Sequence, residues 1–215
     1  MTLIARLGPF ISAGCPTDDA ALRQSVVQAF TDSIGCMTVG ARSDVVRGLC
    51  SAFQQAAPGL TPIYGTSTRL APAMAALVNG ASAHAWDLDD WEDMGNTHPS
   101  AALVPALLAI ASTGEYDGPR ILKAYATGFE VIARLGEIAT RGQYQAGFHV
   151  TGTLGALGAA AAVAHLLGLD ADRAGHAVAL AASQAMGLTD LARQRQKAMA
   201  ASHHAGGRVL MHLTG

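Results

Sequence analysis

Hydrophobic residues recur at steps of three and four along most of this chain, which is the spacing of amphipathic helices. In the segment 18–41, for example, Leu22, Val26 and Phe30 fall on one face. The same spacing returns in four later segments, 100–112, 118–139, 152–169 and 170–188. Strand patterns are scarce, since the one short candidate, 60–68, contains a Pro and a Gly that favour a loop. The pattern predicts an all-α chain.

Residues that begin and end helices lie at the expected places. Thr17 is placed to N-cap the first of these helices, and Gly40 to end it. Pro119 falls where the first turn of a helix accepts proline. Gly168 is placed to close one helix, and Asp170 to cap the next.

The uncharged run 150–169 is long enough to span a bilayer. Alanine and glycine dominate it and His165 interrupts it, whereas strong insertion needs Leu, Ile, Phe or Val. We therefore expect no membrane span. The helix 152–168 should instead lie at the centre of the core or at a dimer interface, because its small side chains allow neighbouring backbones to approach closely.

Composition limits the classes of function. With 215 residues, the chain suits one sizeable domain. A net charge of −2 and a pI near 6.4 give no overall attraction for nucleic acid or anionic lipid. Three cysteines without a CxxC pair argue against a disulfide framework and against a thiolate metal site. No signal peptide is recognisable, so a reduced, cytoplasmic setting is expected.

Charge is concentrated in one short block. Five acids stand within seven positions, and a histidine lies on each side: His84, Asp87, Asp89, Asp90, Glu92, Asp93 and His98. One interpretation is a DDxxD motif made by Asp89, Asp90 and Asp93, which would hold magnesium diphosphate on a helix as in isoprenoid synthases. Aromatic residues make up only 5% of the chain, and a carbocation pocket requires more rings.

Two other interpretations of the acidic block use its histidines. His84, Asp87 and His98 have the side chains of a zinc or iron site, although their spacing matches no common coordination motif. Alternatively, crowded carboxylates and a nearby imidazole form an acid/base pair for proton transfer beside a substrate carboxylate. His98 would then be held by Pro99 at the start of a helix. A solvated acidic loop, with His98 as a cap, is the plain structural alternative.

A second candidate lies at the start of the glycine-rich helix. His149 precedes TGTLGALG, whose free backbone N–H groups and positive dipole end favour an anion such as a substrate carboxylate. The plain alternative is a histidine that caps a buried helix. His84, His165 and His176 lie within apolar helical patterns and are interpreted as structural.

The end of the chain is basic. No acid follows Asp190, while three arginines, one lysine and two adjacent histidines do: Arg193, Arg195, Lys197, Arg208, His203 and His204. This segment could be a solvated helix, a clamp for a polycarboxylate or a weak nucleic-acid contact. The last lacks the interleaved aromatic side chains that stack on bases.

Six blocks in order resemble the MmgE/PrpD family. They are DSIGCMTVGA, VNGASAHAWDLDDW, THPSAALVPALLAIA, GFEVIARLGE, GFHVTGTLGALGAAAAVAHLLGLD and AASQAMGL. The resemblance implies an all-α helical domain, usually homodimeric, followed by a smaller α+β lid domain. It also implies lyase or isomerase chemistry without metal or cofactor on small di- and tricarboxylates such as 2-methylcitrate or cis-aconitate.

The resemblance also implies roles for single residues. Asp87, His98 and His149 match family positions that carry catalysis, and Lys197 matches a lysine that contacts a substrate carboxylate. We expect His98 and His149 to transfer protons and Asp87 to orient His98. Thr151 and Asp90 join Lys197 as candidate substrate-binding residues.

The chain departs from the family pattern after about residue 190, where a K-R-x-H-x-G-R motif is replaced by KAMAASHHAGGR. We therefore expect residues 1–215 to be one truncated N-terminal helical domain that lacks the lid and turns over substrate poorly. The rival expectation is a non-catalytic dimerisation module or degenerate fragment of the family. In either case no nucleic acid is expected as a partner.

Overall fold

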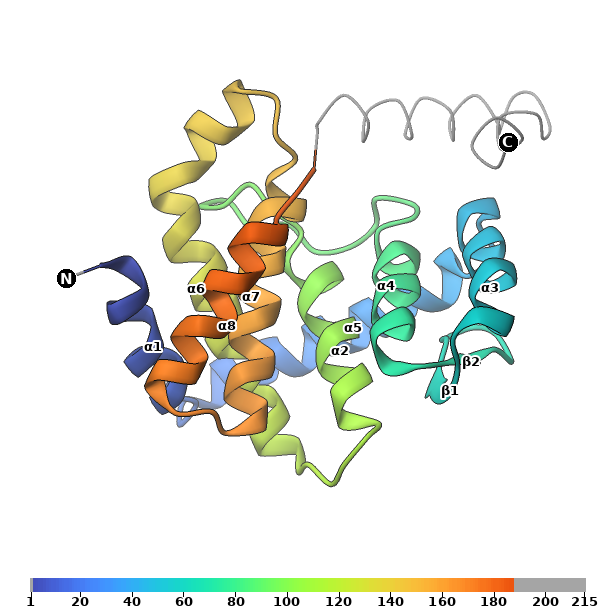
Figure 1. Cartoon of the computed structure of the whole chain (residues 1–215), viewed down its shortest axis with the longest axis horizontal. Helices are drawn as coiled ribbons and strands as arrows, with labels where there is room; N and C mark the ends of the chain where they lie inside the picture. Colours follow the sequence, from blue (N-terminus) through green and yellow to red (C-terminus); the bar gives the residue numbers. More distant parts are fainter. Residues whose placement is uncertain (1, 188–215) are drawn as a thin grey trace.

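A computed structural model describes residues 2–187 of the chain (Figure 1). In this part the chain is mainly helical, as predicted. Its elements are α1 (Leu3–Ala13), α2 (Ala20–Gly40), α3 (Asp44–Ala56), β1 (Pro58–Pro62), β2 (Arg69–Leu70), α4 (Pro72–Ala83), α5 (Pro99–Ala111), α6 (Gly118–Gln145), α7 (Val150–Leu167) and α8 (Ala171–Gln184).

The segment 60–68, which is expected to be a loop, lies mostly between the two strands of a small antiparallel hairpin, and its first three residues belong to β1. Thr61 pairs with Leu70, and Pro62 with Arg69. The hairpin forms because it has an apolar face to bury: Ile63 and Leu70 pack with side chains of α3 and α4 in a small core of their own. The prediction of a loop is confirmed for residues 63–68 and wrong for residues 60–62, because two short strands give too few alternating positions for a sequence pattern.

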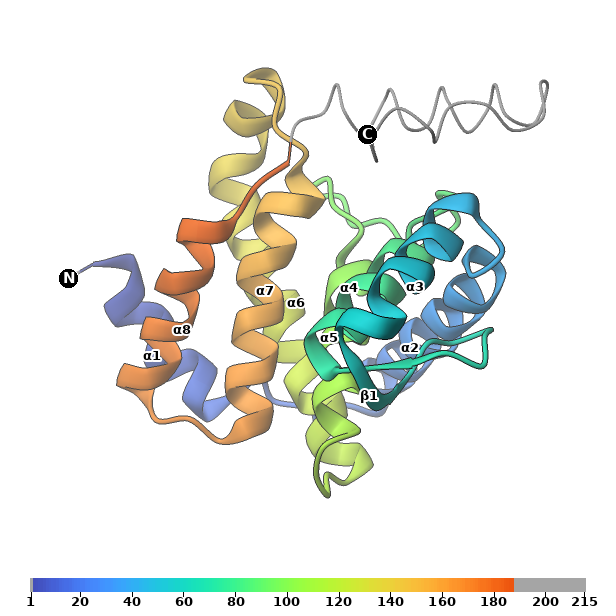
Figure 2. The same cartoon turned by 45° about the vertical axis from the view of Figure 1, so that its right-hand side comes forward.

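Helix α7 lies in the centre of the main core, as predicted. It packs against α5, α6 and α8 (Figure 2). Its contact with α6 is close because glycines face each other. A Cβ on Gly128 would lie 2.7 Å from the carbonyl oxygen of Gly158, which is far inside van der Waals contact. Within residues 2–187, α7 alone is long and apolar enough to cross a membrane, and half of it is buried by its neighbours.

Most helix ends follow the expected residues. Gly168 is left-handed (φ 72°) after α7, and the Asp170 side chain caps α8 by accepting from Arg173 N–H. Pro119 lies in the first turn of α6, and α2 ends at Gly40. The N-cap of α2 was predicted wrongly.

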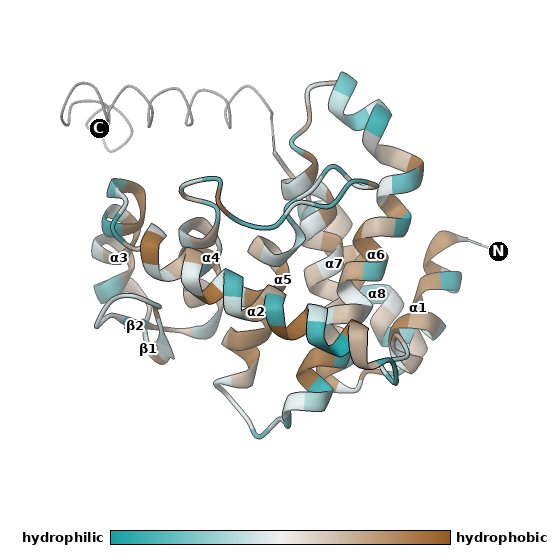
Figure 3. Cartoon of the chain, turned by 180° about the vertical axis from the view of Figure 1, so that it is seen from behind, coloured by the Kyte–Doolittle hydropathy of each residue, from teal (hydrophilic) through white to brown (hydrophobic). Residues whose placement is uncertain are grey.

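That cap is Asp19, whose carboxylate accepts from Ala21 N–H, and Thr17 lies two residues before it. Both residue types cap helices well, so the pattern could not choose between them. Seen from behind, α2 shows both polar and apolar residues along its length (Figure 3).

The fold brings three helix ends together. The loop 84–98, which joins α4 to α5, runs across the same end of the molecule as the first residues of α5 and α7 (Figures 1 and 2). The backbone N–H of His98 donates to Thr151 Oγ1 at 3.1 Å and so ties the start of α5 to the start of α7. The acidic block therefore lies over two helix N-termini.

Candidate functional site

Three histidines from distant parts of the sequence meet at this end of the molecule. His84 follows α4, His98 precedes α5 and His149 precedes α7. The ring centres of His84 and His98 are 4.7 Å apart, and those of His84 and His149 are 5.7 Å apart. The two predicted proton-transfer residues thus both lie next to a third imidazole.

The His98 ring lies between two carboxylates. Its Nε2 is 3.7 Å from Asp87 Oδ1, and its Nδ1 is 3.5 Å from Asp89 Oδ2. Only 21% of the side chain is exposed. Pro99 in the first turn of α5 and the backbone hydrogen bond to Thr151 fix the residue from both sides. The ring is therefore held in place with an acceptor next to each nitrogen.

Asp87 reaches His98 through an unusual backbone conformation. Its φ is +57°, in the left-handed region that Asp and Asn tolerate better than most residues. Half of its side chain (51%) is exposed. The geometry supports its predicted role as the residue that orients His98, and leaves it at the open side of the cluster.

Asp89 is the buried carboxylate of the site, and its side chain is 0% exposed. Its two oxygens lie 2.8 and 3.1 Å from His84 Nδ1. A carboxylate without water requires such partners, because burying it alone is costly. Within residues 2–187, its ion pairs are with the imidazoles of His84 and His98.

The sequence analysis missed this His84–Asp89 pair. His84 was interpreted as structural because it continues the apolar pattern of α4. In the structure it is the C-cap residue of that helix and contacts both other histidines. A signal was present: the histidine stands at the end of an apolar helical pattern, three residues before the first of five acids.

Asp90 holds the start of α5. Its carboxylate accepts the backbone N–H of Ser100 at 3.1 Å and the Ser100 hydroxyl at 2.6 Å. The Ser100 hydroxyl also lies 2.7 Å from the buried Tyr125 hydroxyl. Burial raises the pKa of Asp90, although the hydrogen bonds from Ser100 oppose this effect. Asp90 was expected to bind substrate, but both of its oxygens are already engaged within the protein.

The second helix start places the other candidates. His149 is the N-cap residue of α7, and its backbone N–H donates to the carbonyl oxygen of Gly187 at 3.1 Å. Thr151, expected to bind substrate, accepts from the backbone of His98 and so links the two helix starts. Lys197, the predicted cation, lies outside the described residues.

The DDxxD interpretation does not fit this geometry. It needs Asp89, Asp90 and Asp93 on one face of a helix, but the segment is a loop closed by a bridge between Glu92 and Thr97. Asp89 and Asp90 bind different partners, His84 and Ser100. Glu92 accepts from the backbone N–H of Gly95 within the loop at 2.8 Å. The acids therefore have separate tasks.

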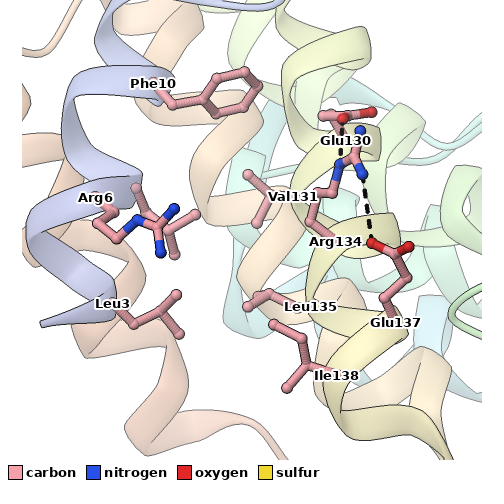
Figure 4. A pocket seen from close by; sticks show the side chains of 10 residues that line it. Leu3, Arg6, Phe10, Glu130, Val131, Arg134, Leu135, Glu137 and Ile138 are labelled. Atoms are coloured by element: carbon pink, nitrogen blue, oxygen red, sulfur yellow. Dashed lines mark hydrogen bonds and ion pairs between the residues drawn. The ribbon is translucent and has the colours of Figure 1, made fainter.

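A hollow between α1 and α6 is a second place where a small molecule could fit (Figure 4). Its volume is about 360 Å³, and its walls are mostly apolar. At its rim Arg134 Nε donates to Glu130 at 2.7 Å, and a second guanidinium nitrogen lies 3.4 Å from Glu137. The walls carry two arginines, Arg6 and Arg134, and two glutamates, so the hollow has no excess of positive charge for a polycarboxylate, and the histidine cluster is the better candidate.

Comparisons with known proteins agree with the resemblance seen in the sequence. The model of the MmgE/PrpD N-terminal domain matches residues 6–210, past the last recognisable block near residue 190. Human cis-aconitate decarboxylase is 38% identical over 123 residues, which cover 54% of this chain and 25% of that protein.

Two fungal proteins match over longer stretches. A cis-aconitate decarboxylase-like protein of Aspergillus oryzae is 32% identical over 80% of this chain and 38% of its own length. The cis-aconitate decarboxylase of Aspergillus terreus is 32% identical over 73% of this chain and 34% of its own length. The matched region thus spans about a quarter to two fifths of these relatives. Since the domain model covers nearly the whole sequence, the chain belongs to the MmgE/PrpD family.

Proposed function

We propose that this chain is the helical part of a lyase that acts on a small di- or tricarboxylate of the cis-aconitate class. The observation that carries the proposal is the cluster of His84, His98 and His149 around the carboxylates of Asp87 and Asp89. The matched relatives named cis-aconitate decarboxylase support this substrate class. A homodimer and a cytoplasmic location stay predictions.

The surroundings of the cluster favour an anionic substrate. The first residues of α5 and α7 lie at the end of the molecule where the histidines meet. Helix N-termini carry a partial positive charge that favours carboxylates. Because Asp90 already caps the start of α5, one carboxylate of the substrate would lie at the start of α7, and Lys197 would neutralise further charge.

The cluster also offers the groups that the chemistry requires. In a decarboxylation, a carboxylate leaves as CO₂, and a proton must reach the carbanion that remains, either at the carbon that held the carboxylate or at the other end of the allylic system. In a dehydration, a base removes a proton beside a carboxylate, and an acid protonates the departing hydroxyl. Both reactions use imidazoles placed next to the reacting carbon. His98, oriented by Asp87, and His149, across the cluster, would fill these roles.

The alternative of a non-catalytic dimerisation module explains the cluster less well. A helical domain that serves only as an interface gains little from a fully buried carboxylate. Removing a charge from water costs free energy, whereas an apolar side chain packed at the same place would not carry this cost. Asp89 is buried on imidazoles rather than on an arginine or lysine. This arrangement is typical of functional sites, where titratable groups are held close together.

Turnover of cis-aconitate tests the proposal. The release of CO₂ from cis-aconitate is measured with wild-type protein and with His98→Gln, His149→Gln and His176→Gln. We expect the first two variants to lower kcat by roughly 10²-fold or more, the scale of a lost general acid or base. His176 lies exposed on α8, so its variant is the matched control.

Binding is measured separately, by calorimetry with citrate-like ligands. Turnover that is equal in all four proteins, with folding intact, would contradict the assignment of the histidines. The non-catalytic module would be favoured instead if the wild type neither binds nor turns over any of citrate, cis-aconitate and 2-methylcitrate.

A further inference from the structure

We propose that His84, Asp87, Asp89 and His98 form a binding site for a divalent transition metal, best suited to Zn²⁺, and that metal binding switches off the proton-transfer site. One donor atom from each of the four residues lies within 4.8 Å of all the others. The inhibitory consequence rests on the proposed function, whereas the metal site itself does not.

The distances are close to those of a zinc centre. Zn–N and Zn–O bonds of about 2.0–2.1 Å at tetrahedral angles place neighbouring donor atoms about 3.3 Å apart. Here His84 Nδ1 and Asp89 Oδ2 are 2.8 Å apart, and His98 Nδ1 and Asp89 Oδ2 are 3.5 Å apart. The ion would replace the proton that His84 and Asp89 share, and these two distances differ from the ideal value by no more than about half an ångström.

One nitrogen of the cluster gives an independent reason to expect a ligand. His98 Nδ1 is buried and makes no hydrogen bond to any residue of the described range 2–187. Buried side-chain nitrogens are nearly always paired, so an orphan needs an explanation. This nitrogen faces Asp89, the oxygen of which already contacts His84. A metal ion placed between His84, Asp89 and His98 would bind the lone pair of His98 Nδ1.

Charge and exposure complete the site. Asp89 brings a negative charge into a fully buried position, and a divalent cation would neutralise it together with Asp87. Asp87 is half exposed and lies at the open side, where an ion can enter and a fourth ligand is needed. Two imidazoles with two carboxylates suit zinc, whereas Mg²⁺ and Ca²⁺ prefer oxygen ligands alone.

Metal binding would stop catalysis by His98. An imidazole that holds a metal through Nδ1 keeps its proton on Nε2, so it has no lone pair left to accept another. The ion would also draw Asp87 away from Nε2, which it now faces at 3.7 Å. Zn²⁺ and substrate should therefore exclude each other.

The experiment titrates the whole 215-residue chain with Zn²⁺ by calorimetry and with Co²⁺ by visible absorption, in the absence of substrate. We expect one bound ion per chain and the intense absorption of tetrahedral Co²⁺. His84→Gln and Asp89→Asn should each weaken binding at least about tenfold. Far-UV circular dichroism confirms that both variants fold.

Control variants remove competing donors. His176→Gln takes away an exposed histidine far from the cluster, and the double variant His203→Gln/His204→Gln takes away the histidine pair of the basic segment. Binding should stay within twofold of wild type in both. Binding of Co²⁺ to a free cysteine would give a cobalt–thiolate charge-transfer band in the near ultraviolet.

If the variants of His84 or Asp89 fail to fold, imidazole ¹⁵N spectra of the wild-type protein decide. Zn²⁺ should shift the ring signals of His84 and His98 and leave that of His176 unchanged. Equal binding in all variants, loss of binding in a control, or unshifted rings of His84 and His98 would overturn the metal site.

Failure of this inference can be told from failure of the proposed function. Turnover in the presence of a chelator, without Zn²⁺ binding, would overturn only the metal site. Binding of one Zn²⁺ by a chain that never turns over a polycarboxylate would overturn only the proposed function. If both hold, Zn²⁺ should inhibit competitively with substrate, and the chelator should restore activity.

Discussion

Replacement of Asp90 by alanine should destabilise the protein more than the loss of an ordinary helix cap. Asp90 accepts two hydrogen bonds from Ser100, one from the backbone N–H and one from the hydroxyl. The first belongs to the start of α5, where His98 supplies no side-chain cap. Asp90→Ala therefore leaves the backbone N–H of Ser100, a buried residue, without its acceptor at the helix terminus.

The magnitude follows from these two losses. A missing N-cap costs about 0.5–2 kcal/mol. A buried donor without an acceptor costs about 1–3 kcal/mol. Since the two overlap in part, we expect the free energy of unfolding to fall by about 2–4 kcal/mol, which lowers Tm by about 5–15 °C in a chain of this size.

A matched control is available at the start of α8. Asp170 caps that helix with a side chain that is 62% exposed, so water can replace it in Asp170→Ala. This variant should lose only about 1 kcal/mol. Thermal and urea denaturation, followed by circular dichroism, compare the two. A loss for Asp90→Ala no larger than that for Asp170→Ala would refute the buried capping role.

The partly buried carboxylate of Asp90 also predicts how the stability of the protein depends on pH. Because burial raises the pKa of Asp90 above its ordinary 3.8, the folded state binds this proton more tightly than the unfolded state. The free energy of unfolding then falls as the pH rises through the folded pKa. Asp90→Asn lacks this ionisation, so its stability relative to wild type should improve between pH 4 and pH 7. A constant difference over that range would contradict the raised pKa.

Three further predictions concern the core, the orienting carboxylate and the need for metal. Gly128→Ala should destabilise the protein by about 1–3 kcal/mol, because its Cβ would lie 2.7 Å from the Gly158 carbonyl oxygen. Gly142→Ala, whose Cβ would have nothing within 4 Å, should instead stabilise α6 by about 0.5–1 kcal/mol. Equal shifts of Tm in the two variants would contradict the close approach of α6 and α7. Asp87→Asn should lower kcat less than His98→Gln if Asp87, 3.7 Å from His98 Nε2, has only the proposed orienting role. Steady-state kinetics compare the two variants. Turnover should continue after dialysis against a chelator. Activity that is lost on dialysis and returns only when metal is added back would show that the reaction requires a metal.

Much of the fold can be predicted because local signals and burial agree. The apolar spacing of α2 and the small residues of α7 indicate helices whatever surrounds them, and Gly168 and Asp170 mark a junction through their backbone preferences alone. The hairpin of β1 and β2 has no such signal. It depends on an apolar face that α3 and α4 supply, which the local sequence does not contain.

The site was predicted less completely for a related reason. His98 and His149 stand out because each precedes a recognisable helix start. The pairing of His84 with Asp89 depends on how the loop 84–98 turns, and the left-handed backbone of Asp87 helps to set that turn. A pattern of residue types does not contain this dihedral angle, so the sequence does not show which of the five acids of the block pairs with His84.

The structure explains why charge is concentrated in this loop. The loop must leave the end of α4, pass over the N-termini of α5 and α7, and hold a histidine at the start of α5. Asp90 fixes the helix start, Glu92 closes the loop, and Asp87 and Asp89 face the imidazoles. Two acids thus build the frame and two serve the site. Substitutions of the first pair should therefore change stability before activity, whereas substitutions of the second pair should change activity or metal binding in a protein that still folds.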